Sequence, residues 1–282
     1  AEDIKLRWEY SMEYYESELA DEITFYEFIQ YEFYRQWYKL KKYANDNGIK
    51  IIGDIPIYVA YDSADVWAHP ELFQIDDERN PIAVAGCPPD GFSATGQLWG
   101  NPLYKWDYHK YTNYDWWIKR IERSVKLYDV VRIDHFRGFD EYYSIPAKDK
   151  DATGGHWEKG PGIDLFNGIK YCLGDINIIA EDLGYITDTV RQLVKDSGFP
   201  NMKVLEFAFD SRDSSGPRDY LPYNYDKNCV VYTGTHDNET LKGWLDDIEP
   251  EEVQMIEEYI GRKVETKTQL VDEIIRMAQA ST

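Results

Sequence analysis

The sequence predicts an α/β protein with a parallel sheet, of the kind found in (β/α)8 TIM barrels. Two observations lead to this prediction. Helical segments with an apolar face alternate with short strands rich in β-branched residues, as they do around parallel sheets. An acidic residue also stands at the C-terminal end of four separate strands, where (β/α)8 barrels build their active sites. These four residues are Asp54, Asp134, Glu181 and Asp237.

Hydrophobic spacing places the elements along the chain. An amphipathic helix is expected over residues 22–47, because apolar residues recur at helical intervals and Asn47-Gly48 supplies a stop. Further helices are expected at 116–127, 165–173 and 187–197, and strands at 49–54, 130–134, 176–182, 203–209 and 229–234. Residues 55–114 interrupt the alternation. Their length and their content of Pro, Gly, Tyr and Trp predict an active-site loop or a small inserted subdomain.

The number of strands predicts an incomplete barrel. About five strands are visible, whereas a closed barrel has eight. We therefore expect residues 22–282 to form part of a catalytic barrel, whose open edges would pair with further strands. Residues 1–21 contain several Tyr and Trp residues and predict a helical segment of an inserted subdomain. A doubly wound sheet is the alternative, but no glycine-rich nucleotide motif follows a strand.

Composition argues against several classes of function. The 282-residue chain has a formal net charge of −21, which disfavours binding to nucleic acid or to anionic membrane surfaces. Its three cysteines have neither disulfide-framework nor zinc spacing. No apolar run approaches the ~20 residues of a membrane span, and no signal peptide is recognisable. We expect a cytoplasmic protein. The aromatic content of 16% suits either a large core or the stacking of sugar rings.

Carboxylates at matching strand ends suit the cleavage of glycosidic bonds. Cleavage uses a proton donor, and retaining enzymes add a nucleophile about 5–5.5 Å from it. Arg132 lies two residues before Asp134, on the same face of a strand, where it could hold Asp134 ionised. His236, beside Asp237, could donate a hydrogen bond to a sugar hydroxyl. Each carboxylate taken singly is explained as well by a helix cap or a surface charge.

Other chemistries remain open at this point. His135 and His236 each adjoin a strand-end aspartate, so a two-metal hydrolase is conceivable, although the five histidines show no metal-binding spacing. No GxSxG motif indicates a serine hydrolase. The residues therefore favour a carboxylate site, and the two-metal alternative stays open.

Six segments connect the sequence to a known family. They are GDIPIYVAYDSADVW from Gly53, PPDGFSATGQLWGNPLYKW from Pro88, VRIDHFRGF from Val131, IIAEDLGYIT from Ile178, MKVLEFAFD from Met202 and YTGTHDNET from Tyr232. The chain resembles glycoside hydrolase family 77, the amylomaltase-type 4-α-glucanotransferases, from about residue 22 to its C-terminus. The resemblance implies a (β/α)8 barrel and an enzyme that transfers part of an α-1,4-glucan to the 4-hydroxyl of an acceptor sugar, with retention.

The resemblance also implies roles for individual residues. It implies Asp134 as the nucleophile, Glu181 as the general acid/base and Asp237 as the carboxylate that stabilises the transition state. The substrate-binding positions that it implies are Asp54, Asp90, Gln97, Trp99, Arg132, His236 and Asp210. The implied substrates are α-1,4-glucans and maltooligosaccharides, with glucose or maltose as acceptor and without a cofactor or metal. Residues 88–101 resemble the family's loop over the acceptor side, where Gly91 replaces the aromatic residue of some relatives.

Two other functions stay open. An α-1,4-glucan hydrolase of the amylase type would share the barrel and the carboxylates. A glucan-binding fragment without catalytic activity would fit the incomplete barrel. The products formed from a short maltooligosaccharide would separate the three.

Overall fold

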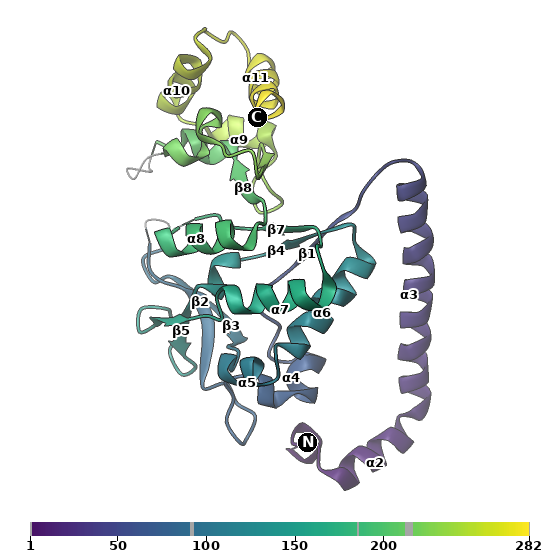
Figure 1. Cartoon of the computed structure of the whole chain (residues 1–282). Coiled ribbons are helices and arrows are strands. Elements are labelled where there is room, and N and C mark those ends of the chain that lie inside the picture. The colour runs from purple at the N-terminus through teal and green to yellow at the C-terminus, as the bar shows by residue number, and fades with distance from the viewer. Residues whose placement is uncertain (1, 91–92, 185, 212–216, 282) are drawn as a thin grey trace. The chain divides into compact units, whose positions relative to one another are not determined.

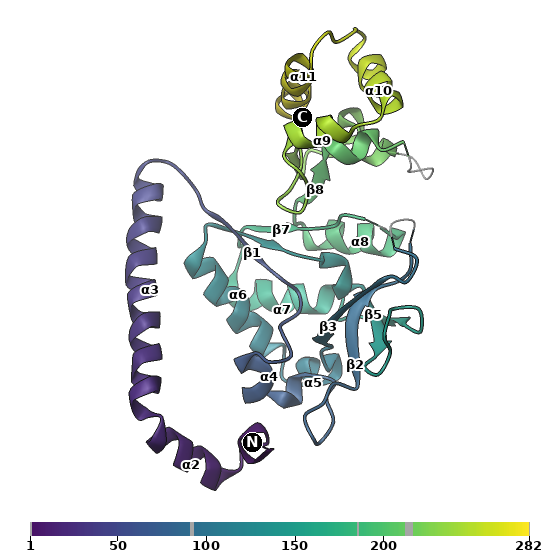
Figure 2. The same cartoon turned by 180° about the vertical axis from the view of Figure 1, so that it is seen from behind.

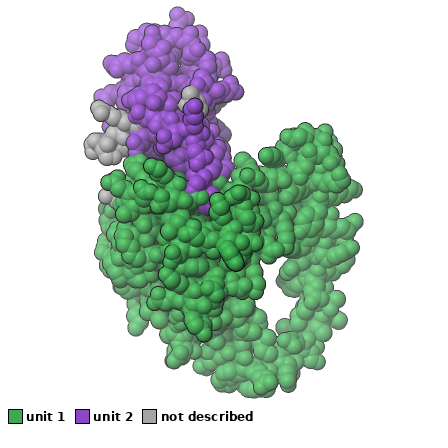
Figure 3. Space-filling model, in the orientation of Figure 1, with its two compact units in different colours: residues 1–178, 186–197 green, residues 179–185, 198–282 purple. Residues whose placement is uncertain are grey.

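The computed structural model describes residues 2–90, 93–184, 186–211 and 217–281. The chain divides into two compact units (Figure 3). Unit 1 comprises Ala1–Ile178 and Ile186–Ser197, and unit 2 comprises Ile179–Tyr185 and Gly198–Thr282. None of the helices in the described ranges is long and apolar enough to cross a membrane.

Unit 1 begins with the helices α1 (Glu2–Lys5), α2 (Glu9–Glu18) and α3 (Ala20–Asp46). The helix predicted at 22–47 is confirmed as α3, but none of the residues of α3 is buried. Many of its apolar side chains are exposed, and Phe25, Phe28 and Phe33 are more than half exposed. Figures 1 and 2 show α3 as a long helix at the edge of the unit. The assignment of residues 1–21 to an inserted subdomain stays a prediction.

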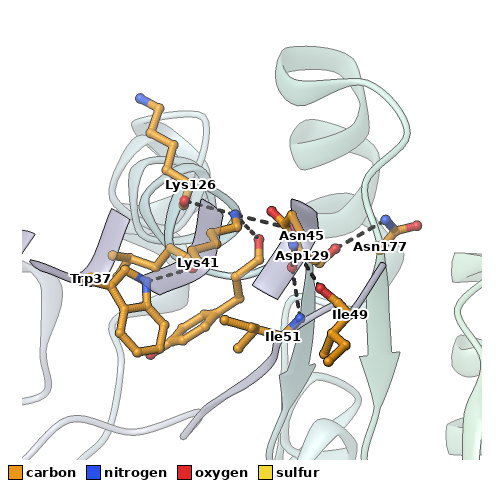
Figure 4. A network of polar contacts seen from close by, with 10 residues as sticks. Trp37, Lys41, Asn45, Ile49, Ile51, Lys126, Asp129 and Asn177 are labelled. Carbon is orange, nitrogen blue, oxygen red and sulfur yellow. Dashed lines mark hydrogen bonds and ion pairs between the residues drawn. The ribbon is translucent and has the colours of Figure 1, made fainter. Parts of the chain in front are cut away.

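Polar contacts near the C-terminal end of α3 attach it to the sheet (Figure 4). The Trp37 indole N–H donates to the Leu127 carbonyl at 2.8 Å, and the Asn45 amide donates to the Asp129 carboxylate at 2.8 Å. The same carboxylate accepts from the Ile51 backbone N–H at 2.8 Å. Asp129 therefore joins α3 to the residue that precedes the first strand.

The first sheet of unit 1 consists of parallel strands. β1 (Ile52–Ile55) pairs with β4 (Val130–Ile133), and their register sets Asp54 beside Arg132. On the other side of β4, the Val131 N–H donates to the Asn177 carbonyl at 2.9 Å, directly before β7 (Ile178–Ala180). The register of β1 and β4 therefore brings two of the predicted site residues together.

Helices with apolar faces cover this sheet. α6 (Asp115–Leu127) and α7 (Ile163–Leu173) pack against each other, and α6 also contacts β1 and β4. Their buried residues include Trp117 and Ile121 on α6 and Phe166 on α7. The final helix of unit 1, α8 (Asp188–Ser197), packs against α7. The predicted helices at 116–127, 165–173 and 187–197 are thus confirmed, with ends that differ by at most two residues.

A second sheet in unit 1 was not predicted from the sequence. Its strands are antiparallel, in the order β3-β2-β5-β6. They are β2 (Ala83–Cys87), β3 (Gln97–Pro102), β5 (Glu141–Pro146) and β6 (His156–Lys159). The short helices around it are α4 (Ala64–Ala68), η1 (Pro70–Leu72), α5 (Trp106–Tyr111) and η2 (Phe136–Phe139). Part of the segment 55–114 is therefore a sheet, and its role as an active-site insertion stays a prediction.

Unit 2 contains the parallel pair β8 (Asn201–Val204) and β9 (Cys229–Tyr232). The strand predicted at 203–209 is wrong beyond Val204, because Leu205–Phe209 form the 3-10 helix η3. The remaining elements are η4 (Pro217–Tyr220), η5 (Pro222–Asn224), α9 (Leu241–Asp247), α10 (Pro250–Ile260) and α11 (Lys267–Ala280). A core that includes Leu245, Ile256 and Ile274 joins these helices to η3.

Candidate functional site

Unit 1 brings one cation and two carboxylates together at the ends of β1 and β4. Arg132 is almost fully buried, and its Nη1 lies 2.6 Å from Asp54 Oδ2 and 3.1 Å from Asp134 Oδ1. Asp134 follows β4 directly, and its N–H donates to the Ile55 carbonyl at 2.9 Å. The guanidinium thus bridges two acidic side chains that neighbouring strands supply. Such a bridge favours the ionised form that a nucleophilic carboxylate needs.

The chain turns sharply just after Asp134. His135 has a φ of 51°, in the left-handed region, and starts η2. Burial, and secondly the charge of Arg137, lower the pKa of His135 to about 3, so its ring is neutral. Trp99 meets this ring edge to face, with centroids 4.9 Å apart.

Trp99 comes from β3 and connects the antiparallel sheet to the end of β4. Its indole N–H donates to Gln97 Oε1 at 3.0 Å, and its ring lies 6.3 Å from that of Tyr58. The side chain is still 37% exposed. An exposed aromatic face near a carboxylate is suited to stack on the apolar face of a sugar.

Asp90 forms a hydrogen bond within its own segment of the chain. Asp90 is exposed, and its Oδ1 accepts from the Ser93 N–H at 2.7 Å. Its role in substrate binding stays a prediction. The departure noted at Gly91 lies outside the described residues.

Unit 2 carries the proposed general acid/base. Glu181 follows β7, is 9% exposed, and accepts from the Leu183 N–H at 2.8 Å. The next residue, Asp182, accepts from the Met202 N–H at 3.0 Å and from the Asn201 amide at 3.3 Å. Burial raises the pKa of Asp182, and these hydrogen bonds oppose that rise. Asp182 therefore fixes the segment with Glu181 to the start of β8.

The remaining predicted residues of unit 2 lie near the ends of β8 and β9. Asp237 and His236 are both largely exposed, with His236 Nε2 3.6 Å from Asp237 Oδ2. Thr235 Oγ1 accepts from the Asp237 N–H at 3.2 Å and donates to Asn238 Oδ1 at 2.9 Å. Asp210 is half-buried and ends η3.

The structure thus groups the predicted residues by unit. Six of them lie in unit 1. Arg132 joins Asp54 and Asp134. Trp99 contacts Gln97, whereas Asp90 accepts a hydrogen bond from Ser93. Glu181, Asp210, His236 and Asp237 belong to unit 2. The joint action of Asp134 and Glu181 stays a prediction. Among the described residues, no cluster of three His, Cys, Asp or Glu side chains could hold a metal ion.

Sequence reasoning missed two acidic residues of unit 2, the half-buried Asp182 and the buried Glu206. The position of Asp182 directly after Glu181 was a signal that could have found it. Glu206 is an acidic residue inside the apolar run MKVLEFAF, and burying a charge in such a run costs free energy unless the charge is paired. Its position in that run was a signal that could have found it.

Comparisons with known proteins place the chain in a family. A family model described as 4-alpha-glucanotransferase, glycoside hydrolase 77, matches residues 1–282. A 4-alpha-glucanotransferase of Clostridium butyricum is 56% identical over 86% of this chain and 50% of its own length. One of Streptococcus pneumoniae serotype 4 is 50% identical over 93% of this chain and 51% of its own length.

Solved structures agree with this placement. An amylomaltase from Streptococcus agalactiae in complex with acarbose matches with a TM-score of 0.93 and 46% identity, over 100% of this chain and 56% of that one. An amylomaltase from Corynebacterium glutamicum, at 21% identity, has a TM-score of 0.66 and shares the fold. The chain spans about half the length of the curated relatives it matches. The predicted architecture is confirmed as an α/β fold with the strands of an incomplete barrel, and the chain belongs to the glycoside hydrolase 77 family of 4-alpha-glucanotransferases.

Proposed function

We propose that this protein transfers a segment of an α-1,4-glucan to the 4-hydroxyl of an acceptor sugar. The observation that carries the proposal is the Arg132 guanidinium, which bridges Asp54 and Asp134 at 2.6 and 3.1 Å. Its charge favours an ionised Asp134 at the end of a strand, as nucleophilic attack demands. The named activity of the family and of its relatives supports the same reaction.

The proposed mechanism has two displacements. Glu181 donates a proton to the glycosidic oxygen while an oxygen of Asp134 attacks the anomeric carbon, so that the C–O bond breaks and a glycosyl ester forms. The ionised Glu181 then takes the proton from the acceptor's 4-hydroxyl. That oxygen displaces Asp134, and both groups return to their starting states. Asp237 stabilises the positive charge that develops on the sugar ring in both steps.

The proposed substrates are linear α-1,4-glucans and maltooligosaccharides, with glucose or maltose as acceptor. Trp99 supports this choice, because its partly exposed ring lies beside His135, next to the proposed nucleophile. A neutral polymer also suits a chain with a net charge of −21, which would repel an anionic one. We propose that the reaction takes place in the cytoplasm, where the three cysteines would stay reduced. Fractionation of the producing cells would test the compartment.

The decisive experiment is incubation of the purified chain with maltotriose, followed by chromatography of the products. Transfer predicts glucose together with a series of longer oligosaccharides, and Glu181→Gln should abolish both. Glucose and maltose without longer products would instead support a hydrolase. Binding of maltotriose without turnover, unchanged in Asp134→Asn, would support a glucan-binding fragment. Each of the last two results would refute the proposal for this chain.

A further inference from the structure

Glu206 is a buried acidic residue that has no part in the proposed mechanism. It lies in η3, two residues after β8, and only 4% of it is exposed. None of the described residues forms a hydrogen bond with its Oε1. Burial raises the pKa of Glu206 to about 7. Burying a carboxyl oxygen without a hydrogen bond costs free energy of folding.

The Glu206 carboxyl packs against the backbone just after β9. A Cβ atom added to Gly234 would lie 2.6 Å from Glu206 Oε1 and 2.9 Å from its Cδ. The Glu206 backbone N–H also donates to the Thr233 carbonyl at 3.1 Å. Both the backbone and the side chain of Glu206 therefore contact the segment that leaves β9.

This segment leads directly to Asp237. Thr235 follows Gly234, and its N–H and hydroxyl both donate to Asn238 Oδ1 at 2.9 Å. The Asp237 N–H donates back to the Thr235 hydroxyl at 3.2 Å. A shift of Gly234 would also displace Asp237, because the hydrogen bonds within this turn hold residues 235–238 together as a rigid unit.

We propose that Glu206 is a positioning residue for Asp237 and His236, whose carboxyl fills the space beside Gly234 and fixes the path of residues 233–237. The proposal rests on the proposed transferase function, in which Asp237 stabilises the transition state. Glu206 does not contact the sugar itself. It acts by holding the turn that presents Asp237, and a displacement of about 1 Å in such a group can lower the rate 100-fold.

The charged residues on the elements around η3 have contacts of their own. Glu252 on α10 accepts from the N–H and the hydroxyl of Ser211, at 2.9 and 3.0 Å. Lys203 on β8 lies over the ring of Tyr220, 5.6 Å from its centroid. Asp219 lies on η4, and His236 and Asp237 follow β9. Burial by itself accounts for the raised pKa of Glu206. Deprotonation above neutral pH therefore places a charge beside Gly234, where the neutral acid had been.

The first test compares Glu206→Gln with the parent chain in maltotriose transfer from about pH 6 to about pH 9. Glutamine keeps the shape of the protonated acid but does not ionise. Above about pH 7 we expect kcat to fall further in the parent than in the variant, because loss of the proton of the general acid Glu181 lowers both, whereas ionisation of Glu206 lowers only the parent. Glu251→Gln, at an exposed position of α10, is the control and should show the parent's profile. An alkaline decline that is the same in Glu206→Gln would overturn the proposal.

The second test asks whether substitutions of Glu206 and Gly234 have non-additive effects on kcat. Gly234→Ala should lower kcat about tenfold or more, since its methyl group collides with the carboxyl, while KM changes less. Glu206→Ala removes the carboxyl, and the double variant should regain most of the activity that Gly234→Ala lost. Gly168→Ala is the matched control, because its added Cβ meets its nearest neighbour at an ordinary 3.7 Å. Losses that simply multiply in the double variant would overturn the proposal.

A third readout separates this proposal from the proposed function. One component of the infrared carbonyl band of protonated carboxylic acids should titrate with a midpoint of about 7 in the parent chain, and that component should be missing in Glu206→Gln. A chain that transfers no glucan would refute the proposed function. In that case, the Gly234 and Glu206 variants are compared by urea unfolding. Non-additive midpoints would support the contact, and additive midpoints would overturn it.

Discussion

The bridge that Arg132 forms between two strands should contribute measurably to stability. The test is a double-mutant cycle with Arg132→Met, Asp54→Asn and both together. Methionine keeps much of the volume of the side chain and removes its charge. The residual side-chain exposure is 8% for Arg132 and 38% for Asp54, so the pair is neither fully buried nor freely hydrated.

The expected coupling energy follows from this geometry. Unit charges about 3 Å apart interact by about 5.5 kcal/mol at an effective dielectric constant of about 20, and by about 1.4 kcal/mol in water. Desolvation of Arg132 offsets part of that gain, and Asp54 is open to solvent on one side. We therefore expect a coupling of about 1.5–3 kcal/mol, the range of hydrogen bonds to charged groups.

Urea unfolding of the four chains, followed by far-UV circular dichroism, measures this coupling without reference to activity. The control is the exposed pair Lys42 and Asp46, which has a similar distance of 2.8 Å. Exposed pairs four residues apart on a helix couple by about 0.3–0.5 kcal/mol, and added salt should weaken this pair far more. A coupling for Arg132 and Asp54 no larger than that of the control would refute the reasoning.

Three further predictions concern packing, pH and substrate binding. Burial lowers the pKa of His109 to about 4 from 6.5, so the unfolded chain binds the proton more tightly and stability falls as the pH drops from about 6.5 to about 4. The free energy of unfolding should fall by about 3 kcal/mol over this pH range. Urea unfolding measured at several pH values should show this loss. A loss of the same size in His109→Gln would contradict the prediction. Gly53→Ala places a Cβ 2.0 Å from the Tyr128 ring and should lower the free energy of unfolding by about 1–3 kcal/mol. Gly168→Ala should change it little. Equal melting temperatures for the two variants would disprove this prediction. Trp99→Ala should raise KM for maltotriose about tenfold with a smaller change in kcat, and an unchanged KM would argue against sugar stacking there.

The sequence predicted the relation of Arg132 to Asp134 correctly, because residues two apart on a strand share a face. It did not predict that Arg132 lies even closer to Asp54, on the neighbouring strand. That contact depends on the register between β1 and β4, whose residues are 78 positions apart for this pair. Register is set by pairing across the sheet, and no local pattern encodes it.

The prediction for MKVLEFAFD was half right for a related reason. An apolar run of this length fits a buried strand and a buried helical turn equally well. Pairing with β9 keeps residues 201–204 extended, and the chain then winds into η3, where the Glu206 N–H meets the Thr233 carbonyl. The antiparallel sheet in unit 1 escaped prediction because its strands are short and β2 pairs with β5, which lies more than 50 residues further along the chain.

The sequence by itself determined the alternation of helices and strands, the strand ends that carry Asp54, Asp134 and Glu181, and the family, because local spacing and long contiguous motifs encode them. Asp237, expected at a strand end, instead lies in a turn beyond β9, which ends at Tyr232.

The tertiary structure alone decided that α3 leaves many of its apolar side chains exposed. It also decided that Arg132 bridges two strands, that Trp99 meets His135, and that Glu206 is buried beside Gly234. Each of these contacts depends on which distant segments pack together. Burial and proximity then set the charge and the orientation of a side chain, which its neighbours in the sequence leave undetermined.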